Sequence, residues 1–191
     1  MQSRVLSATR SEFGRNATWF TALSAFERVI AVVQTVIIAR VLGITEYGVY
    51  GFLFGTIGFV ASVVGLQMGL TATVYVARYR GTEKAKASAV ITIVGRFGWA
   101  VGALFVVLAA PFSPALATFF LGSGQYQLPM ALGIVFVGAT IVSGIQEGVA
   151  QGFEIFRSLA KIKIFSSLLT LAAIAPMASY FGLVGVLAAV L

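Results

Sequence analysis

Five long apolar runs, separated by short gaps, constrain the fold of this chain more than any other feature of its sequence. Each run has the roughly 20 residues that a helix needs to cross a hydrocarbon core of about 30 Å. Charged residues make up only 10% of the chain and hydrophobic residues 59%, whereas soluble domains carry roughly 25% charged residues. The sequence therefore predicts an all-α bundle of transmembrane helices.

We place the spans at residues 16–39, 47–76, 88–110, 129–153 and 164–181. A sixth apolar run covers residues 182–191, which at about 1.5 Å of rise per residue is only about 15 Å long. We therefore expect about six helices in a single transmembrane domain over residues 1–191, forming the front part of a longer protein. One kinked helix with its bend at Pro176 would also account for the last two runs.

Basic residues gather in every second gap between these runs. Ten of the thirteen lysines and arginines lie in the amino-terminal arm and in the gaps after the second and fourth runs, and the remaining gaps hold Arg40 alone. Cytoplasmic loops of membrane proteins carry such an excess of positive charge. The pattern predicts a multi-pass protein with its amino terminus in the cytoplasm. Because the charges flank apolar runs, we expect them to meet lipid headgroups and not nucleic acid.

The chain contains no cysteine, histidine or aspartate, so six glutamates supply all of its carboxylates. This composition removes disulfides and catalysis by thiolate or imidazole, and the glutamates form no cluster with the spacing of a metal site. We therefore expect neither an enzyme nor a bound cofactor or metal.

Several polar and charged residues lie inside the apolar runs, where a charge costs at least about 2.5 kcal/mol at the bilayer centre. Such groups must face the bundle interior, one another or water. Arg96 and Glu147 have similar depths and suit either a structural ion pair or a site for an anionic headgroup, since guanidinium binds oxyanions bidentately. Glutamate in a span also suits uptake of a proton or Na⁺. The candidates are Arg28 and Arg96 for headgroup binding, and Glu27, Gln34, Gln146, Glu147 and Gln151 for cavity lining or ion coupling.

The second run carries a ridge of small residues whose spacing alternates between three and four. Its members are Gly48, Gly51, Gly55, Gly58, Ser62, Gly65 and Gly69. This spacing places them on one helix face, and small residues let helices approach closely in lipid. The ridge predicts either static packing of helices or a surface along which helices slide. Gly55→Leu is expected to disrupt the bundle, because a large side chain would separate helices that touch at the ridge.

Between the first two runs the chain reads Ile38-Ala39-Arg40-Val41-Leu42-Gly43-Ile44-Thr45-Glu46-Tyr47-Gly48. This segment resembles the A-R-x-L-G-x-x-x-Y-G junction of bacterial polysaccharide flippases of the Wzx type, in the multidrug/oligosaccharidyl-lipid/polysaccharide exporter superfamily. Weaker similarities follow at Tyr75-Val76-Ala77-Arg78-Tyr79 and at Gly152-Phe153-Glu154-Ile155-Phe156-Arg157. Independently of the resemblance, Gly43 is suited to end the first helix.

The resemblance implies two six-helix lobes around a central cavity, with this chain supplying most of the first lobe. It also implies transport, without bond chemistry, of an undecaprenyl-diphosphate-linked oligosaccharide across the bacterial inner membrane. The implied partners are that anionic lipid-linked oligosaccharide, membrane lipids and a C-terminal lobe outside this chain. An ion-coupled multidrug exporter of the same superfamily and a non-transporting membrane scaffold are the alternatives. A polar cavity would favour either transporter over the scaffold.

Overall fold

The computed structural model describes the backbone of residues 2–190 and the side chains of residues 25, 26 and 28–190. Within these residues every regular element is a helix, so the predicted all-α fold is confirmed. Four helical stretches of the described chain are long and apolar enough to cross a membrane. The elements are α1 Gln2–Val64, α2 Met68–Tyr79, α3 Lys84–Ala109, the 3-10 helix η1 Ala110–Phe112, α4 Ser113–Leu121, the 3-10 helix η2 Gly124–Tyr126, α5 Gln127–Gly152 and α6 Phe156–Val190.

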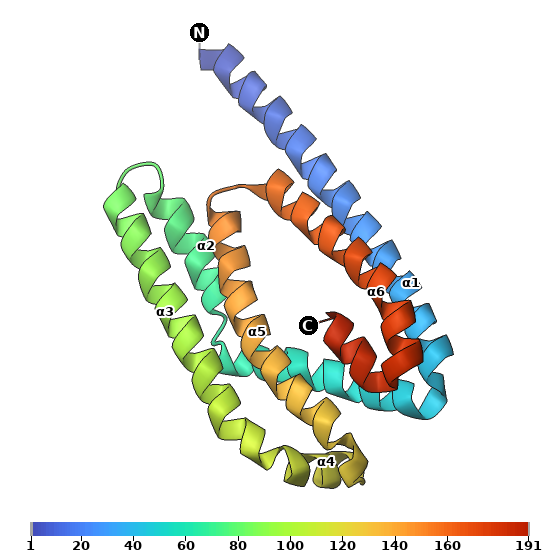
Figure 1. Cartoon of the computed structure of the whole chain (residues 1–191). Coiled ribbons are helices and arrows are strands. Elements are labelled where there is room, and N and C mark those ends of the chain that lie inside the picture. The colour runs from blue at the N-terminus through green and yellow to red at the C-terminus, as the bar shows by residue number, and fades with distance from the viewer. Residues whose placement is uncertain (1, 191) are drawn as a thin grey trace.

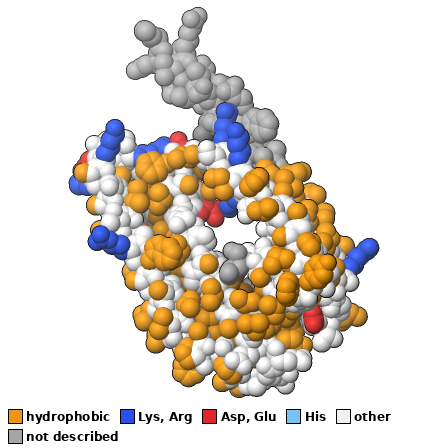
Figure 2. All heavy atoms as spheres, viewed as in Figure 1, with side chains coloured by type: hydrophobic (Ala, Val, Ile, Leu, Met, Phe, Trp, Pro, Cys, Tyr) orange, Lys and Arg blue, Asp and Glu red, His pale blue; other side chains and the backbone are white. Residues whose placement is uncertain are grey.

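The helices form two groups that are joined at one end of the molecule. On one side α6 packs along α1, and on the other α2 and α3 pack on α5. The second half of α1 crosses from one group to the other and connects them, and the ends of α3 and α5 near α4 extend beyond this crossing (Figure 1). In the space-filling view the molecule has a central opening between the two groups (Figure 2). Apolar side chains cover most of the surface around this central opening.

A sharp turn at Gly43 divides α1 into residues 2–42 and 44–64. Gly43 has a φ of 73° and a ψ of 178°, a backbone conformation that glycine adopts without the steric cost of a Cβ atom. The first helix of the chain thus stops at the glycine that the sequence marks as a helix end. The turn sends the second half of α1 across the bundle (Figure 1).

The second predicted span, residues 47–76, is divided between α1 and α2. Its two parts meet at Leu66 and Gln67, which have φ values of 48° and 53°. There the amide of Leu66 bonds to the carbonyl of Val63 at 3.3 Å and the amide of Met68 bonds to that of Gly65 at 3.0 Å. The regular helical ladder therefore stops between the halves, although the spacing of small residues continues through this point.

The last two predicted runs meet within α6 at Gly182, where φ is 55° and ψ is −136°. Pro176 lies inside the helix, so the non-helical residue is Gly182 and not the proline. The segment after Gly182 folds back toward the middle of the molecule (Figure 1). Ile38 of α1 packs there with Ile174 and Val186 of α6 in a small buried cluster.

α5 is the most buried of the four candidate spans, and its glycines bring neighbouring backbones into contact. A Cβ atom added to Gly148 would clash with the carbonyl of Gly69 on α2, and one added to Gly102 of α3 would lie 3.1 Å from the carbonyl oxygen of Gly138. Close approach at small residues is how helices pack in lipid. Both α2 and α3 therefore come into close backbone contact with α5.

Most of the predicted ridge of small residues is open. A Cβ atom added to Gly48, Gly51, Gly55 or Gly58 would meet nothing within 4 Å, whereas Gly69 lies against α5. The expectation that Gly55→Leu separates two helices of this bundle is therefore wrong. The physical reason is that residues 44–64 of α1 pack on α5 through another face, which places Leu53 and Ile57 against Gly133 and leaves the first part of the ridge open.

Candidate functional site

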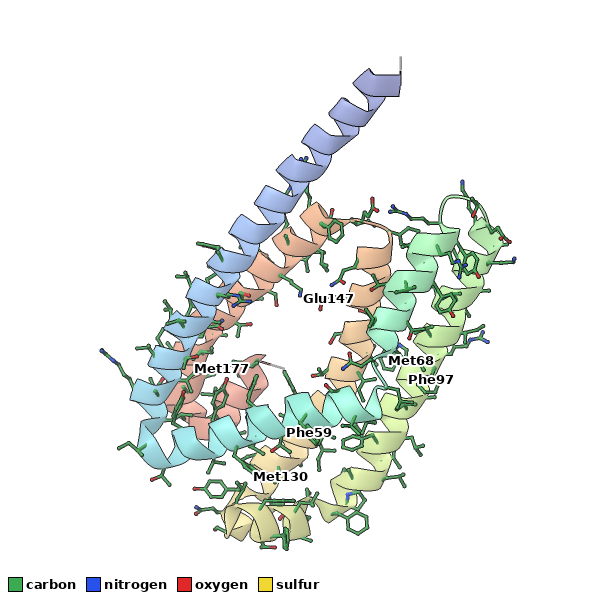
Figure 3. All side chains as sticks on the ribbon, turned by 180° about the vertical axis from the view of Figure 1, so that it is seen from behind. Phe59, Met68, Phe97, Met130, Glu147 and Met177 are labelled. Atoms are coloured by element: carbon green, nitrogen blue, oxygen red, sulfur yellow. The ribbon has the colours of Figure 1, made fainter. Side chains whose placement is uncertain are left out.

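An ion pair connects α5 to α6 beside the central opening. Nζ of Lys163 on α6 donates to Oε1 of Glu147 on α5. The Lys163 side chain is 42% exposed and that of Glu147 is 32% exposed. Figure 3 shows Glu147 projecting from α5 into the opening. Because both groups are accessible, the pair is available for exchange with ions that enter the opening.

On the α6 side of Glu147 lies a cavity of about 640 Å³, which we call the lysine cavity. Ser166 and Ser167 follow Lys163 by three and four residues, so the three side chains share one face of α6. Apolar residues from α1, α5 and α6 complete the walls. The polar lining consists of Ser143, Gln146, Glu147, Lys163, Ser166 and Ser167.

A second cavity of about 420 Å³, the glycine cavity, lies at the break between α1 and α2. Glu147 lines this cavity as well as the lysine cavity. Oγ1 of Thr73 donates to the carbonyl oxygen of Gly148 at 2.9 Å and so ties α2 to α5 at its edge. The polar side chains of its lining belong to Ser62, Gln67, Thr73, Thr140, Glu147 and Gln151. The carboxylate of Glu147 therefore stands between two polar cavities.

The arrangement suits binding of an organic anion better than binding of a metal. The described side chains contain no group of three or more carboxylates that could hold a metal ion. The lysine cavity instead offers an ammonium group, three serine hydroxyls and an amide, all of which are hydrogen-bond donors,. Donors of this kind bind phosphate oxygens.

The family described as "Polysaccharide biosynthesis protein" matches residues 13–191. The chain belongs to this family. No curated protein and no solved structure matches it. The resemblance to polysaccharide flippases that the sequence shows is thereby confirmed, and with its apolar helices this polysaccharide biosynthesis protein is a multi-pass membrane protein.

Three of the residues predicted for this polysaccharide biosynthesis protein line the cavities. Gln146 and Glu147 line the lysine cavity, and Glu147 and Gln151 line the glycine cavity. Nε2 of Gln34 donates to the carbonyl oxygen of Ser167 at 3.0 Å, which holds α1 against α6 beside the lysine cavity. The side chain of Glu27 lies outside the described residues.

The two predicted arginines lie farther out. Arg28 is exposed, one turn before Ala31, which lines the lysine cavity. Arg28 itself is not among the residues that line the lysine cavity. Arg96 is also exposed, but it lies on α3 and lines neither the lysine cavity nor the glycine cavity.

The expected pair between Arg96 and Glu147 is not formed, because Glu147 pairs with Lys163. Gly98 of α3 faces α5, where an added Cβ atom would clash with Ile145. Residues two apart point about 200° apart around a helix. Arg96 therefore points away from α5, and similar depth along two helices did not bring the charges together.

Lys163 was missed as a site residue because it was counted among the basic residues of a cytoplasmic gap. The signal that reveals it is a polar stripe at the start of the fifth run. Lys163, Ser166, Ser167 and Thr170 recur at spacings of three and four, which places them on one helix face. On α5 the polar residues Thr140, Glu147 and Gln151 recur at spacings of seven and four, and the ion pair joins the two polar faces at Glu147.

Proposed function

We propose that this protein flips an undecaprenyl-diphosphate-linked oligosaccharide across the bacterial inner membrane for synthesis of a surface polysaccharide. The observation that carries the proposal is the ion pair of Lys163 with Glu147 at a polar cavity inside an apolar bundle of this family. Charges inside a membrane domain are costly and mark substrate or ion pathways. A scaffold gains nothing from such a cavity.

The chemistry of the lysine cavity matches the headgroup of such a substrate. The ammonium of Lys163 and the hydroxyls of Ser166 and Ser167 supply donors to diphosphate oxygens,. Gln146 offers an amide to sugar hydroxyls. Transport of this kind makes and breaks no bond in the substrate, so the proposed role is not enzymatic and uses no cofactor.

The proposed orientation places the amino terminus, the α2–α3 loop and the α5–α6 loop in the cytoplasm. Basic side chains gather at that end of the molecule (Figure 2), as positive charge does on the cytoplasmic side. Lys163 lies seven residues into α6, about 10 Å from its start. A headgroup from the cytoplasmic leaflet would therefore reach Lys163 early. Alternating access needs a second helical lobe that moves against the first. We propose that this is a C-terminal lobe outside this chain.

A substitution of Lys163 in the chromosomal gene, with the rest of the native protein unchanged, tests this function. We expect Lys163→Met to abolish surface polysaccharide and to accumulate the lipid-linked oligosaccharide, because the headgroup loses its cation. Lys163→Arg keeps the charge and is expected to retain transport. Lys161→Met is the matched control, since Lys161 is exposed on the same helix and lines neither cavity.

The test requires that protein levels in the membrane stay normal. Because Lys163→Met leaves Glu147 without its ion pair, the double variant Lys163→Met/Glu147→Gln is included as a neutral pair. Wild-type polysaccharide in both variants would contradict the proposed function. Loss of drug resistance with unchanged polysaccharide would instead support the multidrug exporter.

A further inference from the structure

A groove of about 540 Å³ runs along the contact between α3 and α5, and we call it the α3–α5 groove. Two of its lining residues, Gly102 and Gly138, lie where the two helices touch, and a Cβ atom added to Gly102 would lie 3.1 Å from the carbonyl oxygen of Gly138. Apolar side chains from both helices form its walls, among them Trp99, Val106 and Val142. The close approach of two backbones at glycine thus leaves an apolar furrow between the helices.

The α3–α5 groove and the lysine cavity share two residues. Ser143 and Gln146 of α5 line both of them, and both residues are exposed. From Gln146 the lining of the groove extends along α5 to Val135, a distance of about 16 Å, which is roughly half of a hydrocarbon core of about 30 Å. The lysine cavity therefore continues into an apolar groove that runs away from the α5–α6 loop.

This combination suits a lipid with an anionic headgroup and a single apolar chain. Lys163 supplies a cation to the headgroup on one side of Ser143 and Gln146,. On the other side, none of the residues that line the α3–α5 groove is charged. A single furrow between two helices holds one chain, whereas a phospholipid carries two acyl chains and a polyprenyl diphosphate carries one. Close packing against the walls favours binding in lipid, where hydrophobicity does not.

We propose that the α3–α5 groove binds the polyprenyl chain of the lipid-linked oligosaccharide while the diphosphate occupies the lysine cavity. The inference rests on the proposed function, and it adds a site for the part of the substrate that the lysine cavity does not hold. A lipid of the cytoplasmic leaflet has its headgroup toward the basic end of the bundle and its chain toward the bilayer centre. The groove leaves Gln146 in that direction.

Photo-crosslinking tests the inference, with the purified protein in nanodiscs of phosphatidylethanolamine and phosphatidylglycerol. The probe is a farnesyl-diphosphate-linked disaccharide that carries a diazirine on its last isoprene unit. We expect mass spectrometry to find its crosslinks within residues 99–107 and 135–142.

A variant that fills the α3–α5 groove should lose these crosslinks. Ala103 is exposed and lines the groove, so Ala103→Phe places a ring where the chain would lie. Ala139→Phe fills the groove from α5 and should give the same loss. Ala100→Phe is the matched control and should keep the crosslinks, because Ala100 is exposed on α3 and does not line the groove, the lysine cavity or the glycine cavity.

A second probe without the chain, a methyl-diphosphate-linked disaccharide, separates this inference from the proposed function. It should bind wild type and Ala103→Phe equally, since the headgroup site is unchanged, and should bind Lys163→Met more weakly. Crosslinks elsewhere in the bundle, with binding that still depends on Lys163, would overturn the groove and leave the proposed function standing. Binding of the chain-free probe that survives Lys163→Met would contradict the proposed function. Loss of the groove crosslinks when phosphatidylglycerol is raised would assign the groove to a phospholipid chain and would also overturn the inference.

Discussion

Gly148 of α5 and Gly69 of α2 bring two helix backbones into direct contact, where no side chain fits between them. Other glycines of the chain face open space, among them Gly55. The sequence shows all of these glycines at helical spacing and does not distinguish the packed ones from the open ones. Their difference depends on which helix lies opposite, and this follows from turns elsewhere in the chain.

Gly148→Ala is expected to lower the stability of the bundle by about 1–3 kcal/mol, the usual cost of an overpacked contact. Its methyl group would clash with the backbone of Gly69, which has no flexible side chain to move aside. Thermal unfolding in detergent measures the effect. Gly55→Ala is the matched control and should unfold with wild type, and equal unfolding temperatures for both variants would contradict the packing described here.

The helices α3 and α5 lie over the third and fourth predicted spans to within four residues at each end. Long apolar runs predict such helices well because length and hydrophobicity are properties of the sequence itself. The break at Leu66 and Gln67 could not be predicted in the same way. These residues adopt positive φ without being glycine, and the continuous spacing of small residues around them is typical of an uninterrupted helix.

The candidate site was predictable to the extent that it depends on a single helix. Gln146, Glu147 and Gln151 fall together because α5 is continuous and keeps its periodicity. The partner of Glu147 depends instead on how α6 and α3 are placed around α5. Arg96 faces away from α5 and Lys163 faces toward it. The depth of a residue along its helix does not predict which neighbouring helix its side chain faces.

Gly43→Ala tests the turn that divides α1. Gly43 has a φ of 73° and a ψ of 178°, a region that is essentially restricted to glycine and costs another residue about 1–3 kcal/mol, so we expect a lower unfolding temperature in detergent. Gly81→Ala in the α2–α3 loop is the control, because Gly81 has no positive φ and an added Cβ atom there meets nothing within 4 Å. Stability equal to wild type in Gly43→Ala would show that the turn does not need glycine.

At the scale of the whole molecule, the end that is rich in basic side chains and the end that is poor in them are the two ends of one bundle. The α2–α3 loop and the start of α6 lie at the end where basic side chains gather (Figure 2). The segment from η1 to η2, Ala110 to Tyr126, contains no charged residue. We expect this separation to orient the bundle in a membrane.

Single cysteines test the orientation, since the chain has none of its own. Thr82→Cys lies in the α2–α3 loop, and Gln125→Cys lies in η2 at the other end. A membrane-impermeant maleimide should label Gln125→Cys on intact spheroplasts and Thr82→Cys only in inverted vesicles. The reverse pattern would place the amino terminus outside the cell, and labelling of both on one side would contradict the membrane-spanning arrangement.

The ion pair of Glu147 with Lys163 also acts as a clasp between the two groups of helices. An anion that takes Lys163 from Glu147 removes the clasp as it binds. Under the proposed function, recognition of the substrate and loosening of the contact between α5 and α6 are therefore a single event.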